Sequence, residues 1–305
     1  MEKFKFLIDE DLEGVRLDKT IADLTGPLIS RSFLQKLIKE GGVLVNGSPK
    51  KASYAVKDED EIEFTVPDAE EASIEAEDIP LDILYEDKDV IVVNKPKGMV
   101  VHPANGHYNG TLVNALMYHC KDSLSGINGV LRPGIVHRID MDTTGSIIAC
   151  KNDAAHMCIA EQLKDHSIDR TYRAICHGVI KDDEITINAP LGRSDKDRKK
   201  MAVKEGGKRA VTHVTVLERF KDYTYVECKL ETGRTHQIRV HMAHIGFPLV
   251  GDEAYCNRKT HFKTEGQCLH AYKLGFIHPT TGEKIETIAP IPEYMGQMLI
   301  KLSML

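Results

Sequence analysis

The stretch Arg132–Gly145, which reads RPGIVHRIDMDTTG, places an aspartate directly after a His-Arg pair and before a Thr-Thr-Gly turn. Two carboxylates, Asp140 and Asp142, stand two residues apart in it. In one interpretation Asp140, beside the cationic pair, attacks or stabilises an electron-poor carbon. In a second, the two carboxylates form an Asp-x-Asp-x-Thr magnesium site, where one accepts a phosphoryl group and the other is a general acid. In a third, they only cap a turn.

The magnesium interpretation has a partner further along the chain. Residues 249–252 read LVGD, an apolar-Gly-Asp element of the kind that completes such sites. Two details weaken it. His137 and Arg138 interrupt the apolar run just before Asp140, although a phosphohydrolase aspartate should end an apolar strand. Glu253 is the one carboxylate that follows the second element at short distance. Within these two stretches alone, the interpretations remain open.

Five ordered stretches together resemble the RluA/RluD family of pseudouridine synthases. Residues 137–145 resemble its HRLDxxTSG signature, with isoleucine in place of leucine and threonine in place of serine. The other four are NKPKGMVVHP at 94–103, RTYRA at 170–174, TGRTHQIRVH at 232–241 and LHA at 269–271. The resemblance covers about residues 80–300, and five motifs in the family's order are far harder to obtain by chance than one.

The resemblance implies an isomerase that converts uridine in RNA to pseudouridine. In this reaction the C–N glycosidic bond breaks, the uracil turns in its pocket, and C5 bonds to the same ribose carbon. No atom is lost, so we expect no cofactor and no metal. The protein must instead supply a carboxylate near the ribose and a pocket for a base taken out of its stack.

The same resemblance implies the site residues. Asp140 is expected to act at the ribose, either as nucleophile on C1′ or as base at C2′, with Arg239 as its ion-pair partner. Tyr172 is expected against the uracil, and Arg138 in the gap that the flipped nucleotide leaves. The turn at 232–235 should offer free backbone N–H groups to an anion. The other expected substrate-binding residues are His137, Arg234, His236 and Gln237.

The first 66 residues predict a small domain of their own. Ser30 can cap a helix that Gly41-Gly42 ends, Asn46-Gly47 is a strong tight-turn signal, and EIEFTV at 61–66 alternates like a strand. An earlier helix should present one apolar face, made of Leu17, Ile21 and Leu24.

This order of helix, helix and hairpin, with Ser30-Arg31 opening the second helix, resembles the S4 RNA-binding domain. In that domain the second helix and the hairpin contact RNA phosphates and shape. The expected RNA contacts are Arg31, Lys36, Lys39, Lys50 and Lys51. Two alternatives follow: a non-catalytic RNA-binding protein in which this domain does the work, and a fragment that merely packs against the rest of the chain.

Charge is unevenly distributed along the chain. The formal net charge is −6, yet residues 68–89 hold ten acidic residues against one lysine, so the remainder is net positive. Residues 192–209 hold eight basic residues against three acidic ones, which indicates a phosphate-binding loop. Its expected RNA contacts are Arg198, Lys199 and Lys200. The S4-like domain and the NKPKG form together resemble the branch of the family that acts on large-subunit ribosomal RNA, and this resemblance implies that RNA as the partner.

The acidic, apolar-poor stretch at 67–79 predicts a linker between an S4-like domain, residues 1–66, and a catalytic domain, residues 80–305. In the catalytic domain, alternating runs predict strands at 90–93, 147–150, 210–217 and 223–230, and amphipathic stretches predict helices around 112–118, 154–164 and 235–245. This order predicts an α+β fold on a large mixed, mainly antiparallel sheet, as the resemblance also implies.

Composition excludes several other classes of protein. No apolar run approaches the length of a bilayer and the start of the chain lacks a signal-peptide core, so we expect a cytoplasmic protein with no membrane partner, and a monomer. Seven cysteines without a close Cys-x-x-Cys pair suit reduced thiols. A zinc site would need four residues at irregular spacing, Cys256, His261, Cys268 and His270, the last of which already belongs to the LHA stretch.

Overall fold

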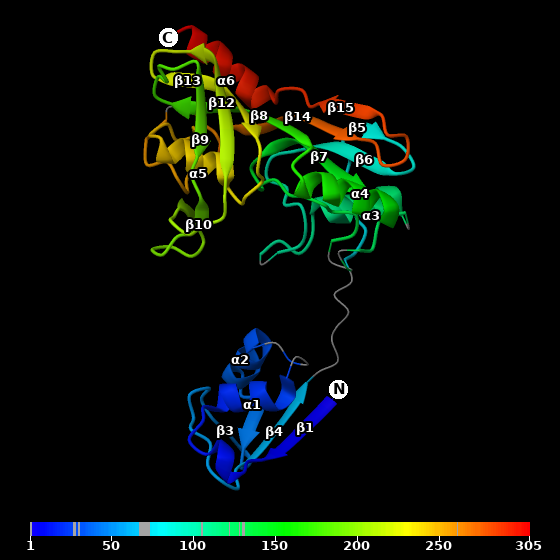
Figure 1. Ribbon diagram of the computed structural model, residues 1–305, viewed down its shortest axis with the longest axis vertical. Coiled ribbons are helices and arrows are strands. Elements are labelled where there is room, and N and C mark those ends of the chain that lie inside the picture. The colour runs from blue at the N-terminus through cyan, green and yellow to red at the C-terminus, as the bar shows by residue number, and fades with distance from the viewer. Residues whose placement is uncertain are drawn as a thin grey trace. The chain divides into compact units, whose positions relative to one another are not determined.

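The computed structural model (Figure 1) describes residues 2–26, 29, 31–66, 74–104, 106–121, 123–127, 129, 132–260 and 262–305. The chain divides into two compact units, Met1–Ala72 and Ser73–Leu305. None of the helices in the described ranges has both the length and the apolar character needed to cross a membrane.

The smaller unit is an antiparallel sheet with two helices. Its strands follow the order β1-β4-β2-β3, and the bounds are β1 (Glu2–Leu7), β2 (Val43–Val45), β3 (Ser48–Pro49) and β4 (Glu61–Val66). A short 3-10 helix, η1 (Glu10–Leu12), precedes the helices α1 (Leu17–Thr25) and α2 (Arg31–Lys39). The expected tight turn joins β2 to β3, where Asn46 and Gly47 have φ angles of 52° and 72°. Two consecutive residues with positive φ form the type of hairpin turn that the Asn-Gly pair favours.

Two features of this unit were not predicted correctly. Strand β1 was missed, although EKFKFL alternates as a strand does, and Phe4 stacks on Phe64 of β4 with ring centroids 5.1 Å apart. In α1, Leu24 is 39% exposed, so it does not share the buried face. Thr25 completes that face by the i, i+4 spacing from Ile21, and its hydroxyl donates to the Ile21 carbonyl at 2.7 Å. Ser30, the expected cap of α2, lies outside the described residues.

The larger unit is built on a sheet of nine strands within the described ranges, and it confirms the expected α+β fold. The order is β5-β6-β7-β14-β8-β13-β12-β9, with β15 beside β14, and only β7 and β14 run parallel. The strands are β5 (Ile83–Glu86), β6 (Val90–Lys95), β7 (Thr144–Cys150), β8 (Asp169–His177), β9 (Glu184–Asn188), β12 (Val211–Arg219), β13 (Tyr223–Leu230), β14 (Leu269–Ile277) and β15 (Lys284–Ile288). A separate hairpin joins β10 (Leu191–Arg193) to β11 (Met201–Val203).

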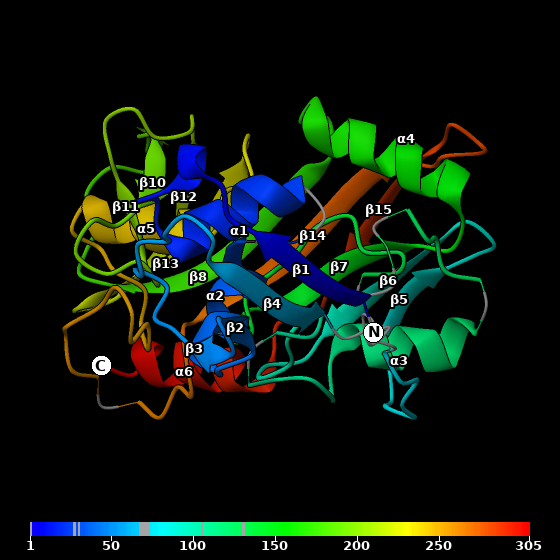
Figure 2. The same ribbon diagram turned by 90° about the horizontal axis from the view of Figure 1, so that it is seen from below.

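Helices cover both faces of this sheet (Figures 1 and 2). Side chains of α3 (Leu112–Cys120) and α5 (Gln237–His244) share one core with alternate residues of the strands, such as Tyr172 and Ala174 of β8. The next residue, Ile175, faces the opposite way, toward α6 (Glu293–Ser303). A further helix, α4 (Asp153–Lys164), packs on β6 and β7 from the face opposite α3. The period-two alternation of each strand therefore separates the two cores.

The chain reaches the larger unit before the expected end of the linker. Ile74 is 8% exposed and belongs to the core that α3 and α5 share. The Glu75 carbonyl accepts from the Asn114 amide at 2.7 Å, and the Glu77 carboxylate accepts from the Gly110 N–H at 2.9 Å. These contacts attach residues 74–79, which the composition assigned to a linker, to the start of α3.

Helix α5 begins two residues later than predicted. His236 has a left-handed backbone, with φ at 56°, so the helix cannot include it and starts at Gln237. The other end agrees with the sequence pattern, because Gly246 takes a φ of 86° just beyond the helix. The early part of the predicted helix is therefore a turn, and that turn faces the cleft described below.

Candidate active site

Asp140 lies at the end of an irregular segment that leads into β7. Its carboxylate is 25% exposed, and its Oδ2 accepts a hydrogen bond from Arg239 Nη1 at 2.8 Å. On the other side, Asp140 Oδ1 lies 3.7 Å from His236 Nε2. One carboxylate oxygen is thus held by an arginine of α5, while the other stands nearer the turn before that helix.

Arg239 is itself fixed by a second carboxylate. Asp252, 1% exposed, accepts from Arg239 Nε at 2.7 Å and from Nη2 at 2.9 Å. Two backbone N–H groups, of Ala254 and Tyr255, also donate to Asp252. The two carboxylates raise the pKa of Arg239, so the guanidinium remains a cation. The fork on Asp252 leaves Nη1 for Asp140, which sets the orientation of the exposed carboxylate.

This geometry explains the LVGD element that imitates a magnesium site. Asp252 does approach Asp140, but the cation between them is the Arg239 side chain. Asp142, the other half of the expected metal pair, forms no part of this arrangement, and burial raises the pKa of its carboxyl group. Asp140 of the Asp-x-Asp element and Asp252 of the Gly-Asp element therefore form a pair of carboxylates on either side of Arg239.

The imidazole ring of His236 is oriented by Tyr255, a residue that the sequence motifs did not identify. The Tyr255 hydroxyl accepts from the Met201 N–H at 2.9 Å and lies 2.7 Å from His236 Nδ1. When the hydroxyl donates its own proton to Nδ1, the hydrogen of the neutral imidazole sits on Nε2, which faces Asp140. The one indication of Tyr255 in the sequence was its position, three residues after Asp252 of the LVGD element.

Lys95 is a second missed residue, although it belongs to the NKPKG stretch. Its side chain is fully buried, and its ammonium donates to the carbonyls of Pro96, Met99 and Met141 at 2.8, 2.8 and 2.9 Å. Burial lowers the pKa of Lys95 to about 7, with Asp142 and Asp140 opposing the shift. The lysine joins the turn at 96–99 to the residue directly after Asp140, and so fixes the backbone that carries the carboxylate.

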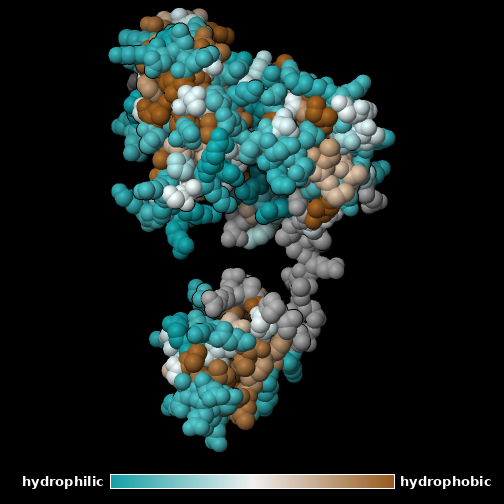
Figure 3. Space-filling view, in the orientation of Figure 1, coloured by the Kyte–Doolittle hydropathy of each residue, from teal (hydrophilic) through white to brown (hydrophobic). Residues whose placement is uncertain are grey.

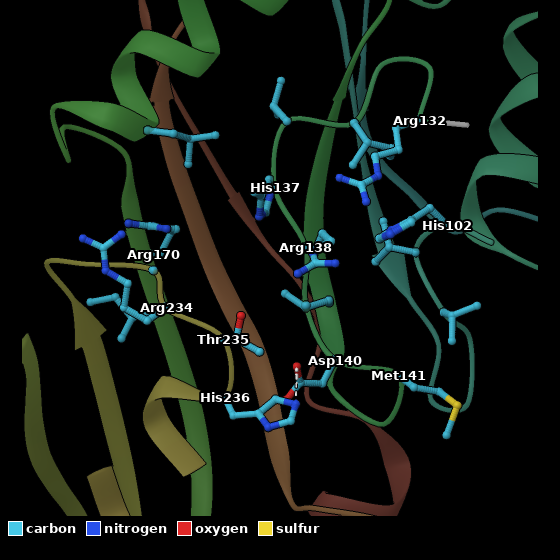
Figure 4. A pocket seen from close by; sticks show the side chains of 18 of the residues that line it. His102, Arg132, His137, Arg138, Asp140, Met141, Arg170, Arg234, Thr235 and His236 are labelled. Carbon is cyan, nitrogen blue, oxygen red and sulfur yellow. Dashed lines mark ion pairs between the residues drawn. The ribbon is translucent and has the colours of Figure 1, made fainter. Parts of the chain in front are cut away.

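Above Asp140 opens a cleft of about 850 Å³ with strongly cationic walls (Figure 4). The basic side chains that line it include His102, Arg132, Arg138, Arg170 and Arg234. Tyr172 and Leu230 contribute an aromatic ring and an aliphatic side chain. The larger unit is mostly hydrophilic on the face shown in Figure 3. The cleft thus combines one carboxylate, one buried ring and many cations, which suits a polyanion with a planar base.

Three of the expected cleft residues differ in what they can offer a substrate. Arg138 is exposed over the cleft, and Arg234 keeps nitrogens free after its Nε donates to the Arg209 carbonyl at 3.1 Å. His137 Nε2 accepts from the Ile148 N–H at 3.2 Å, and burial lowers the pKa of His137 to about 3, so this ring is neutral. It lines the cleft while supporting β7.

Gln237, which was expected to bind the substrate, is hydrogen-bonded inside the protein. Its side-chain oxygen accepts from the Thr232 hydroxyl and from the Arg234 N–H, and its amide nitrogen donates to the Val211 carbonyl and the Thr212 hydroxyl. All of these contacts are internal and the residue is 3% exposed. Gln237 therefore supports the turn before α5, and its side-chain oxygen and nitrogen already have partners inside the protein.

The expected RNA contacts outside the cleft fall on the β10–β11 hairpin and on the smaller unit. Arg198 and Lys199 are exposed between β10 and β11, but the Lys200 ammonium donates to the Ala254 carbonyl at 2.7 Å and so anchors the hairpin. In the smaller unit, Lys39 and Lys51 are exposed, and Lys50 lies over the Tyr54 ring. The side chains of Arg31 and Lys36 lie outside the described residues.

The cysteine and histidine cluster does not gather around one point in the described part of the chain. His270 Nδ1 meets the Thr144 hydroxyl at 2.8 Å, and its Nε2 meets the Ala289 carbonyl at 3.2 Å. Cys268 is buried against Met298. His261 lies outside the described residues. The LHA histidine therefore has a structural role between strands.

A carboxylate held by an arginine lies at the floor of a cationic cleft, which suits an enzyme that acts on a polyanion such as RNA. The same chain holds a small helix-and-sheet unit with exposed lysines. Comparison with known proteins makes the class specific. Residues 89–244 match the family model described as RNA pseudouridylate synthase, and residues 15–62 match the S4 domain. The chain belongs to the RNA pseudouridylate synthase family and carries an S4 domain at its N-terminal end.

Individual proteins agree with this assignment. The chain is 54% identical to the uncharacterized RNA pseudouridine synthase YlyB of Bacillus subtilis, over 99% of each chain. It is 46% identical to the ribosomal large subunit pseudouridine synthase D of Zymomonas mobilis, over 98% of this chain and 96% of that one. Among solved structures, human RNA pseudouridylate synthase domain containing 1 superimposes with a TM-score of 0.56 at 25% identity, covering 73% of this chain and 95% of that chain.

The enzyme isomerises uridine in RNA to pseudouridine. The expected family and activity are confirmed, in preference to the magnesium phosphohydrolase and to the non-catalytic RNA-binding protein.

Proposed function

We propose that this enzyme modifies uridines of large-subunit ribosomal RNA, with Asp140, Arg239 and Tyr172 as the residues that carry the reaction. The proposal about the substrate is supported by relatives named ribosomal large subunit pseudouridine synthase D, at 46% and 44% identity over 95% or more of this chain. The S4 domain fits such a substrate, because it adds exposed lysines at a distance in the sequence from the cleft.

The observation that carries the catalytic proposal is the pairing of Asp140 with Arg239. Since Oδ2 is held by the arginine, Oδ1 is the oxygen that meets the ribose, either as nucleophile at C1′ or as base at C2′. The guanidinium fixed by Asp252 keeps the carboxylate in one orientation while the nucleotide enters. His236 Nε2–H stands beside the same oxygen and can hold it in place.

After the glycosidic bond breaks, the loose uracil must be retained while it turns. Tyr172 and Leu230 line the cleft next to Asp140 and provide a ring and an apolar wall for the base. Burial raises the pKa of Tyr172, so its hydroxyl keeps its proton at neutral pH. For the product to form, C5 loses a proton and N1 gains one, and the tyrosine hydroxyl is the group we assign to that exchange.

The test uses purified protein on transcripts of large-subunit ribosomal RNA, small-subunit ribosomal RNA and transfer RNA. Pseudouridine is mapped by carbodiimide labelling and reverse-transcription stops, with Asp140→Asn as the inactive control. We expect new stops at a few positions of the large-subunit transcript alone. Stops confined to transfer RNA would contradict the proposed substrate while leaving the family assignment intact.

A further inference from the structure

Arg170 is a buried cation that has no charge partner within the described part of the chain. It extends from β8 and is 7% exposed, yet its Nε and Nη2 have no hydrogen-bond partner among the residues that the structure describes. No carboxylate among the described residues forms an ion pair with it. The charged groups nearby are of the same sign, notably Arg234, and burial lowers the pKa of Arg170. Buried guanidinium groups are usually paired, because removing an unpaired charge from water is unfavourable.

The surrounding backbone is shaped to leave room for this side chain. A Cβ atom on Gly233 would lie 2.3 Å from Arg170 Nη1, so a side chain at that position would displace the guanidinium. Gly233 belongs to the turn before α5, and Arg234, which follows it, lines the same part of the cleft. In Figure 4, Arg170 and Arg234 lie together on one wall, while Arg132 and His102 lie on the opposite wall.

The position of Tyr172 shows how close the wall formed by Arg170 and Arg234 lies to the reacting nucleotide. Arg170 and Tyr172 are two residues apart on β8, so their side chains leave the strand on the same face. Both line the cleft that holds Asp140. An anion bound by Arg170 would therefore lie beside the nucleotide whose base rests against Tyr172.

We propose that Arg170, together with Arg234, forms a subsite for one phosphodiester of the RNA next to the target uridine. The inference rests on the proposed function, because it takes RNA to be the occupant of the cleft. A phosphodiester supplies the negative charge that the buried guanidinium lacks, and its free oxygens can accept from the N–H groups that the guanidinium presents to the cleft. A neutral uracil carbonyl would accept one such hydrogen bond but would leave the charge uncompensated.

The first test compares two arginines of the same strand in the full-length protein. The probe is an RNA stem-loop that the wild-type enzyme converts, chosen from the mapping experiment above. For Arg170→Met we expect about 10- to 100-fold weaker binding. The slope of log affinity against log salt should fall by roughly 0.7 to 0.9, because one phosphate is no longer neutralised. The melting temperature should not fall, since the substitution removes an unpaired buried charge.

Arg173→Met is the matched control. Arg173 is three residues further along β8, but it forms an ion pair with Glu227 at 2.9 Å and lies over the Tyr272 ring. Its replacement should lower the melting temperature and leave RNA affinity unchanged. Gly233→Ala provides a second variant, which displaces the Arg170 guanidinium without removing it and should also weaken RNA binding.

The decisive measurement replaces single phosphates of the probe by neutral methylphosphonates. At the phosphate that Arg170 contacts, the replacement should weaken binding to the wild-type enzyme as much as Arg170→Met does. The same replacement should not lower the RNA affinity of the Arg170→Met variant any further. Unchanged affinity and salt slope in Arg170→Met, or methylphosphonate penalties that persist in full in that variant, would overturn the proposal. Failure of the wild-type enzyme to convert any RNA would instead count against the proposed function.

Discussion

At the scale of single residues, Asp140 and Asp252 share one arginine but are not equivalent. Asp252 is buried and takes two nitrogens of the guanidinium, whereas Asp140 takes one and remains open to the cleft. A symmetric pair would serve a metal ion or a shared proton. The asymmetry instead gives one carboxylate the task of holding the arginine and leaves the other able to react.

Asp140→Asn should abolish pseudouridine formation and leave RNA affinity nearly unchanged. The amide is close in shape to the carboxylate, but it neither attacks C1′ nor accepts a proton from C2′. Single-turnover rates and equilibrium binding to the same RNA separate the two effects. Asp142→Asn is the control and should be mild, because the guanidinium of Arg239 is held by Asp140 and Asp252. Equal loss of activity in both variants would revive the paired-carboxylate interpretation.

Tyr172→Phe tests the hydroxyl apart from the ring. The ring keeps its position against the base, so RNA affinity should barely change. If the hydroxyl moves a proton between C5 and N1, the single-turnover rate should fall by about 10²- to 10⁴-fold, the usual contribution of general acid–base catalysis. A rate equal to that of the wild-type enzyme would restrict Tyr172 to a stacking role.

At the scale of elements, two buried histidines connect the catalytic sheet to its surroundings in the same way. His241 of α5 meets the Thr212 hydroxyl through Nδ1 and the Ala189 carbonyl through Nε2, each at 2.9 Å. His270 of β14 makes the corresponding pair of contacts to Thr144 and Ala289. In each ring Nε2–H donates to a carbonyl. Burial lowers the pKa of both histidines and so favours the neutral ring, in which Nδ1 accepts from the hydroxyl.

These histidines predict an acid-sensitive fold. Burial lowers the folded-state pKa of His241 and of His270, while histidines of the unfolded chain titrate near 6.5. Below about pH 6.5 the unfolded chain takes up protons that the folded protein does not, so the free energy of unfolding decreases as pH falls. Urea unfolding between pH 8 and pH 5 measures this, above the range in which most carboxylates titrate.

The control for this effect is His241→Gln, which can keep both hydrogen bonds without titrating. It should be less stable than the wild-type enzyme at pH 8, because the amide fits the site less well, but its stability should change less with pH. An identical pH dependence in the variant would show that His241 does not contribute to the acid sensitivity.

Local sequence patterns predicted four strands and three helices of the larger unit. All four predicted runs became strands. The runs at 210–217 and 223–230 alternate between two different faces, whereas those at 90–93 and 147–150 are continuous apolar runs of strands buried on both faces. The start of α5 could not be read in this way. His236 adopts a left-handed backbone, and its ring is held by Tyr255 from another part of the chain. A turn stabilised by a distant side chain leaves no periodic signal.

At the scale of the whole molecule, the candidate site was predicted only in part for the same reason. Family-like motifs identified Asp140 and Arg239, which the structure brings together. They did not show that Asp252 fixes the arginine, or that Arg170 is left unpaired beside Gly233. Such facts depend on which residues meet after folding, and a single sequence does not contain those distances.

The two-unit organisation gives the last prediction, the removal of residues 1–66. Among the residues that the structure describes, the buried core of the smaller unit runs from Ile8 to Phe64, and the cores of the larger unit begin at Ile74. We therefore expect the remaining chain to fold and to keep its single-turnover rate on a short stem-loop that holds the target uridine. Circular dichroism and thermal melting check the folding.

Binding to full-length ribosomal RNA should nevertheless weaken, and most strongly for highly structured RNA. For every phosphate that the S4 domain neutralises, its removal should flatten the plot of log affinity against log salt by roughly 0.7 to 0.9. A full-length protein in which Lys39 and Lys51 are both changed to Ala is the matched comparison, since these exposed lysines should account for part of the same effect. If the truncated enzyme binds structured RNA with unchanged affinity and salt slope, the S4 domain does not anchor this substrate, and the cleft with its β10–β11 hairpin must select the RNA alone.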